Sequence, residues 1–146
     1  MELSGYGYGY GYGDGYGDGS GYGSGYGYGD GPYWANTIST FAAKWSAPAY
    51  ARYTVLCNEG VKLAFWRSTE HGTAANGGSN APVSAGTVEE VAGPLRNDCG
   101  QGQLHATLIP PKWKGERWWI VALHGDWRGN DEKMWGLKRE ILGECL

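Results

Sequence analysis

Apolar residues at spacings of three and four predict two short helices at the start of the folded region. The first apolar face consists of Ile38, Phe41, Ala42 and Trp45. Asn36 or Thr37 can cap this helix, because a short polar side chain satisfies free backbone N–H groups at a helix N-terminus. Pro48 suits the first turn of a second helix over 49–58, and Gly60 suits its end.

Short apolar runs in the rest of the chain predict a small sheet. The predicted strands cover 61–66, 87–91, 104–109, 117–125 and 137–145. The run at 117–125 is the most apolar, which favours a central position. Residues 137–145 also fit a helix, but we favour an antiparallel strand. A long loop is expected at 68–86 and a polar connection at 126–133. The pattern predicts an α+β domain with N-terminal helices packed on a small, mainly antiparallel sheet.

A strict two-residue period precedes this region. Glycine occupies every odd position from Gly5 to Gly31, and Pro32 ends the repeat. The even positions hold Tyr6, Tyr8, Tyr10, Tyr12, Tyr16, Tyr22, Tyr26 and Tyr28, with Asp14, Asp18, Asp30, Ser20 and Ser24 between them. We therefore divide the chain into a low-complexity, extended Gly-X segment over residues 1–31, called the arm, and a single α+β domain over residues 32–146.

The arm has a simple geometry if it is extended. Side chains alternate along a strand, so all thirteen non-glycine side chains would lie on one face and glycine on the other. The repeat could reach roughly 90 Å at about 3.3 Å per residue. Glycine content alone favours a flexible tail. The ordered alternatives are strand packing within an assembly and a polyglycine-like extended helix.

This reach and period lead to our main functional hypothesis. We expect a structural, self-assembling protein whose arm contacts neighbouring subunits in a filament, tube or layer. The assembly residues would be the eight arm tyrosines named above. The expected partner is therefore further copies of the same chain, as a homo-oligomer or polymer.

Charge and composition argue against several other classes of partner. The net charge is −3, and lysine and arginine are scattered, which argues against nucleic acid and against a membrane surface. We find no signal peptide and no transmembrane segment, which predicts cytoplasmic synthesis and leaves virion or extracellular assembly open. The spacings of Cys57, Cys99 and His105 match no zinc motif, so we predict no metal and no cofactor.

Tryptophan is unusually frequent, and it crowds the C-terminal third. The chain has eight tryptophans and eleven tyrosines against two phenylalanines. Alternate residues of one strand cannot all point inward, so some of these rings are expected at an interface. The candidates are Trp118, Trp119, Trp127 and Trp135.

One pair of residues suggests an alternative, enzymatic function. His105 and Thr107 are two positions apart on a predicted strand and would share a face. This arrangement is similar to the nucleotide-gripping motif of ADP-ribosyltransferases and RNA 2′-phosphotransferases. A histidine that is merely packed or hydrogen-bonded explains the same pattern, so we expect a protein that is not an enzyme. A third interpretation is a binding module for a phage or host protein.

Several motifs together resemble an uncharacterised family of small proteins from tailed phages and bacterial genomes. The motifs are Leu104-His105-Ala106-Thr107, Pro111-Lys112-Trp113-Lys114-Gly115-Glu116-Arg117-Trp118-Trp119 and Leu137-Lys138-Arg139-Glu140-Ile141-Leu142-Gly143-Glu144. The resemblance covers roughly residues 33–146, and members of the family often carry Gly-X repeats. It implies no activity, because the family is a domain of unknown function.

Overall fold

The computed structural model describes residues 31–75, 81–98, 100 and 102–146. The chain divides into two units, Met1–Trp34 and Ala35–Leu146. A short helix, α1 (Gly31–Ala35), spans the boundary between them. The remaining elements all belong to the second unit.

Two further helices follow, as the apolar spacing predicts. They are α2 (Ile38–Ala42) and α3 (Ala47–Glu59). Ser46 caps α3, because its Oγ accepts a hydrogen bond from the Ala49 N–H at 3.5 Å. Gly60 ends α3 in the left-handed region, at φ 74°. None of the helices in the described ranges has the length and apolarity needed to cross a membrane.

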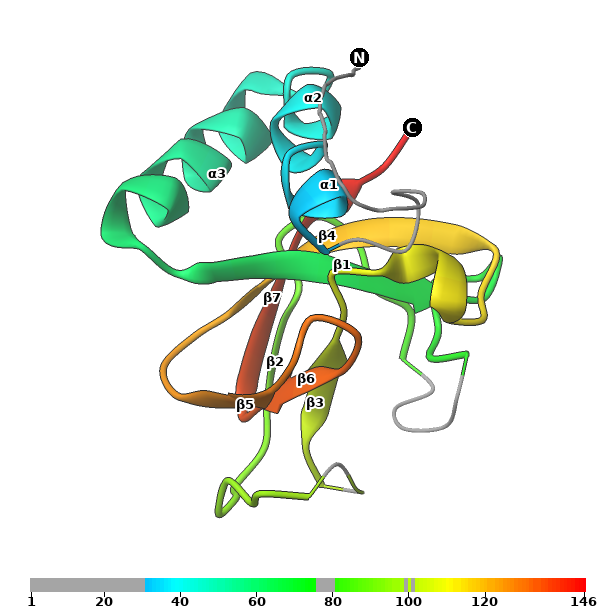
Figure 1. Cartoon of the computed structure of the whole chain (residues 1–146). Helices are drawn as coiled ribbons and strands as arrows, with labels where there is room; N and C mark the ends of the chain where they lie inside the picture. The colour runs from blue at the N-terminus through cyan, green and yellow to red at the C-terminus, as the bar shows by residue number, and fades with distance from the viewer. Residues whose placement is uncertain (1–30, 76–80, 99, 101) are drawn as a thin grey trace. The chain divides into compact units, whose positions relative to one another are not determined.

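A four-stranded antiparallel sheet forms the centre of the second unit (Figure 1). Its order is β1 (Lys62–Ser68), β4 (Arg117–Leu123), β7 (Lys138–Glu144) and β2 (Val88–Glu90). The apolar strand β4 lies between β1 and β7, as its composition predicts. Residues 138–144 form a strand, so the helical alternative for this segment is wrong. The α+β class with an antiparallel sheet is confirmed.

A second, three-stranded antiparallel sheet has the order β3 (Leu104–Ala106), β6 (Met134–Gly136) and β5 (Trp127–Gly129). The sequence predicts only a polar connection where β5 lies. Three residues are too few to establish an alternation, which is why the pattern misses β5 and β6. Gly129 has φ 108°, and a Cβ there would lie 2.9 Å from the Met134 Cα. Only glycine fits this tight hairpin.

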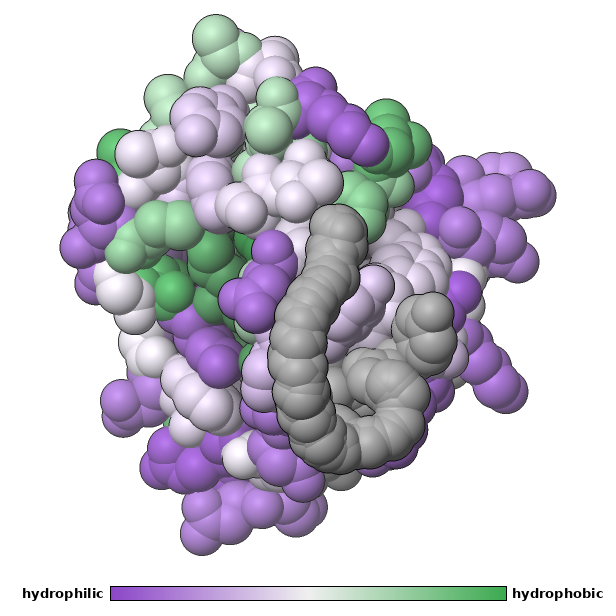
Figure 2. Space-filling view, turned by 45° about the horizontal axis from the view of Figure 1, so that its top comes forward, coloured by the Kyte–Doolittle hydropathy of each residue, from purple (hydrophilic) through white to green (hydrophobic). Residues whose placement is uncertain are grey.

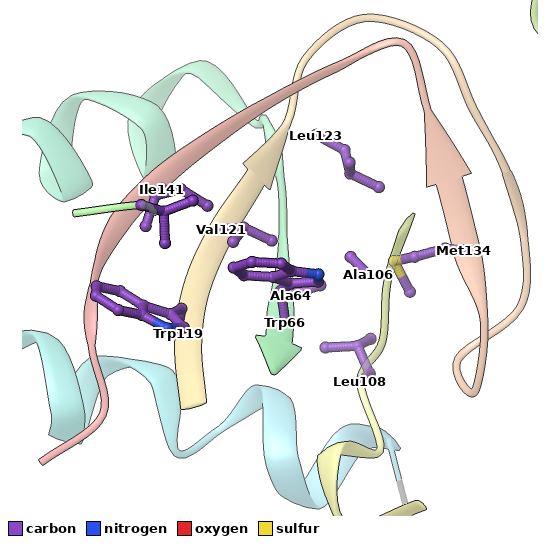
Figure 3. Close-up of a cluster of buried hydrophobic side chains, with 10 residues drawn as sticks. Ala64, Trp66, Ala106, Leu108, Trp119, Val121, Leu123, Met134 and Ile141 are labelled. Atoms are coloured by element: carbon purple, nitrogen blue, oxygen red, sulfur yellow. The ribbon is translucent and has the colours of Figure 1, made fainter. Parts of the chain in front are cut away.

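The hydrophobic core lies between the two sheets. Trp66, Trp119 and Ile141 of the large sheet face Ala106 and Met134 of the small one (Figure 3). The sheets are joined where the backbones of Phe65 and Thr107 exchange hydrogen bonds of 2.7 and 2.8 Å.

The opposite face of the large sheet carries α2 and α3 (Figure 1). The Phe41 and Phe65 rings meet edge to face, with centroids 6.4 Å apart. The Trp45 Nε1 donates to the Glu144 carbonyl at 2.8 Å, near the end of β7. The second unit therefore has three layers: helices, large sheet and small sheet.

Candidate binding groove

An open groove lies where α3 ends and β1 begins, and we call it the groove throughout. It forms because Gly60 reverses the chain between these two elements, and because β4 ends beside them at Leu123. Its volume is about 750 Å³, within the usual range of ligand pockets. The lining residues are Ala35, Cys57, Glu59, Gly60, Val61, Lys62, Leu63, Leu108, Leu123, Gly125 and Trp127. On the face drawn in Figure 2, hydrophobic residues gather around a recess with hydrophilic residues about it.

The groove combines an aromatic wall with apolar and charged groups. Trp127 of β5 is half-buried, and the Lys62 Nζ lies 4.9 Å from its ring centroid. Leu108 and Leu123 also lie on the lining, but they belong to the hydrophobic core and are only 6% and 1% exposed. Glu59 adds a carboxylate on the exposed end of α3. Such a surface can stack an aromatic ring and hydrogen-bond a polar group attached to it.

One wall of the groove carries an exposed thiol, Cys57. Burial, followed by a hydrogen bond with Cys57, raises the pKa of the nearby Tyr53 phenol to about 12. The Tyr53 ring also meets the Trp45 ring edge to face, at 6.2 Å. Tyr53 therefore stays protonated and helps to hold α3, while the Cys57 thiol is accessible as a chemical marker of the groove.

A charged cluster outside the groove lining fixes α3 to the sheet. Arg52 donates two hydrogen bonds to the buried Glu140 carboxylate, at 2.8 and 2.9 Å. The His124 Nε2 lies 2.9 Å from Glu140 Oε1. The hydrogen bond from Arg52, supported by His124, lowers the pKa of Glu140 despite its burial. The carboxylate is ionised and fully paired, so it positions the helix and is a poor general base.

The structure gives His105 and Thr107 separate environments. Thr107 is fully buried; its Oγ1 accepts from the Ile109 N–H at 2.8 Å and donates to the Asp131 carbonyl at 3.4 Å. His105 is half-buried, and none of the described residues hydrogen-bonds its Nε2. Burial, followed by Arg139 and Lys133, lowers the pKa of His105. Neither residue lines the groove, and the Thr107 hydroxyl is not free to hold a ligand.

The four candidate interface tryptophans divide into two pairs. Trp119 and Trp135 belong to the interior, with exposures of 3% and 7%. Their indole N–H groups are satisfied internally, by Ser68 Oγ and by the Arg96 carbonyl, both at 2.8 Å. Their burial lends no support to a role at an interface, which stays a prediction for this pair. Trp118 and Trp127 are half-buried, and Trp127 is the one that lines the groove.

The predicted assembly tyrosines of the arm lie outside the described residues. Within the described ranges, no group of three His, Cys, Asp or Glu side chains could hold a metal ion. Sequence reasoning identified Trp127 but missed Lys62, Glu59 and Leu108 as groove residues. No linear signal could have found them, because the lining extends from residue 35 to residue 127 without a repeated spacing.

Comparisons with protein-family models, curated proteins and solved structures find no match to this chain. The resemblance to the phage and bacterial family therefore stays a prediction.

Proposed function

We propose that this is a structural, self-assembling protein in which the arm of each copy contacts the folded part of a neighbour. The observation that carries the proposal is the two-residue period from Gly5 to Gly31. A strand of this composition buries almost nothing against itself, and ordering its glycines costs more entropy than ordering other residues. It is stabilised only if its tyrosines bind another surface.

The folded part supports a binding role more than a catalytic one. It offers an open groove with an aromatic wall. The buried Glu140 carboxylate is paired with the Arg52 guanidinium and lies 2.9 Å from the His124 Nε2. The alternative enzyme, which would grip a nucleotide through His105 and Thr107, gains no support, because the Thr107 hydroxyl is already hydrogen-bonded inside the domain.

The arm's length suits contact between copies. Extended, the repeat reaches roughly 90 Å, whereas a compact domain of about 110 residues has a radius of gyration near 13 Å. A neighbour's surface is therefore within reach, and each copy can both give and receive an arm. Open filaments or layers grow when each copy binds one neighbour through its arm and receives the arm of another.

The decisive experiment compares the full chain with two arm variants of the same length. In one variant all eight arm tyrosines are replaced by serine, and in the matched control all eight are replaced by phenylalanine. Sedimentation velocity and negative-stain microscopy should give large assemblies for the native chain and the phenylalanine variant, and monomers for the serine variant. Monomeric behaviour of all three proteins at high concentration would overturn the proposal.

A further inference from the structure

We infer that the groove is the receptor for the tyrosine side chains of an arm from a second copy of the chain. This inference rests on the proposed function and deepens it by naming the surface that the arm binds. The groove residues that carry it are Trp127, Lys62, Glu59, Leu108 and Leu123.

The apolar part of the groove suits an aromatic ring. The Trp127 indole is half-buried and has the Lys62 Nζ 4.9 Å from its centroid, so an incoming ring would pack against the part of the indole that Lys62 leaves uncovered. Aromatic pairs add about 0.5–1.5 kcal/mol to the free energy gained from area burial. A tyrosine ring is therefore a better occupant than the serine or aspartate of the arm.

The polar groups suit a phenol. Lys62 supplies N–H donors and Glu59 supplies acceptor oxygens on the same lining. A tyrosine hydroxyl both donates and accepts, so it can use either residue. The lining thus offers the Trp127 indole to a tyrosine ring and the charged groups of Lys62 and Glu59 to its hydroxyl. This combination matches the amphipathic character of tyrosine.

Charge and backbone shape also favour the arm. Residues 1–31 contain Asp14, Asp18 and Asp30 but neither lysine nor arginine. Lys62 on the lining can attract these carboxylates, and Glu59 on the same lining opposes part of that attraction. Glycine at every second position has no Cβ, so the arm backbone can approach the groove closely while its tyrosines point inward.

In an extended arm, the two-residue period places tyrosines at regular intervals along one face. Successive tyrosines on one face of a strand lie about 7 Å apart. Thirty residues precede the first described residue, Gly31, so the segment is long enough to reach the groove of another copy. Any of several tyrosines could then occupy one groove, so the arm can shift along the groove and still make the contact.

The first test uses substitutions in the full chain. Trp127→Ala removes the aromatic wall, and Trp113→Ala is its matched control. Both tryptophans are half-buried and pack against the same core, but only Trp127 lines the groove. We expect Trp127→Ala to raise the protein concentration needed for assembly about tenfold or more, and Trp113→Ala to assemble like the native chain. Circular dichroism checks that both variants fold.

The second test leaves every residue of the folded domain unchanged. A peptide with the sequence of residues 5–13 is added to the full chain in which the eight arm tyrosines are serine, and the rate of Cys57 alkylation is measured. The peptide should slow alkylation at least about fivefold at saturation, because Cys57 lies on the groove wall. A peptide with serine in place of tyrosine is the control and should have no effect.

The outcomes separate the two proposals. Normal assembly of Trp127→Ala together with no protection of Cys57 by the peptide overturns the groove inference and leaves self-assembly standing. Monomeric native protein overturns self-assembly. If that monomer also shows slower Cys57 alkylation than the serine-arm variant, the arm binds the groove of its own copy, which overturns the second-copy inference.

Discussion

The Arg139 guanidinium carbon lies 4.5 Å from the centroid of the Trp66 ring, in the layer between the two sheets. The same guanidinium donates to Glu89 Oε1 at 2.7 and 3.0 Å and to the His105 carbonyl at 2.6 Å. Arg139 is only 5% exposed. Similar stacks join Arg117 with Trp119 and Arg67 with Trp118, at 4.7 and 4.9 Å. Several tryptophans therefore serve as platforms for arginines within the fold.

The Arg139–Glu89 ion pair should be a major stabilising contact. Replacing Glu89 with glutamine would leave the buried Arg139 without its counter-charge, and we expect a loss of about 3 kcal/mol in the free energy of unfolding. Glu90→Gln, one residue away on the same strand and exposed, should change it by less than about 0.5 kcal/mol. Urea denaturation measures both variants. Equal effects of the two substitutions would contradict this assignment.

The contact between Arg52 and Glu140 should depend on pH. Arg52 is half-exposed, so we expect Arg52→Met to cost only about 1 kcal/mol at neutral pH. The folded-state pKa of Glu140 lies below its usual 4.5. The stabilisation that the ionised Glu140 gives the folded state is therefore complete above pH 4.5. It is lost as the pH falls through the folded-state pKa of Glu140. Urea denaturation over a pH series should show the Arg52→Met penalty shrinking in acid.

The control for this pH dependence is Arg128→Met. Arg128 is exposed and hydrogen-bonds the neutral Asn97 side chain. Arg128→Met should change the free energy of unfolding only slightly, and this change should stay constant over the same acid range. An Arg52→Met penalty of the same size in acid as at neutral pH would show that ionisation of Glu140 is not its source.

Gly143 should be irreplaceable because of one close neighbour. A Cβ at this position would overlap the Trp45 indole, which packs across β7 and donates to the Glu144 carbonyl. Gly143→Ala should therefore displace this ring and destabilise the fold by about 1–3 kcal/mol. Gly136→Ala is the matched control, since the nearest atom to a Cβ there is 3.4 Å away. Thermal unfolding monitored by tryptophan fluorescence should separate the two variants.

The two cysteines in the described ranges should differ in reactivity. Cys57 is exposed, whereas burial, followed by the Glu144 charge, raises the pKa of Cys145 to about 12. Because the thiolate is the reactive form, alkylation near pH 8 should modify Cys57 at least about tenfold faster than Cys145. Mass spectrometry of the digested protein measures each rate. In denaturant the rates should converge, and equal rates in the native protein would contradict the burial of Cys145.

The sequence determined the features that depend on neighbours along the chain. Pro48 and Gly60 delimit α3, and the apolar run at 117–125 identifies an inner strand of the large sheet. The period of the arm is likewise visible without a structure, because alternation is a local property. These patterns were sufficient for the α+β class and for the antiparallel sheet.

Only the tertiary structure decided which side chains meet. Arg139 and Glu140 are adjacent charged residues, yet both are buried, on opposite faces of β7. Their partners, Glu89 and Arg52, are 50 and 88 residues away along the chain. The groove likewise combines the end of α3 with β1, β4 and β5. Such contacts follow from strand register and layer packing, which bring together residues that no local spacing relates.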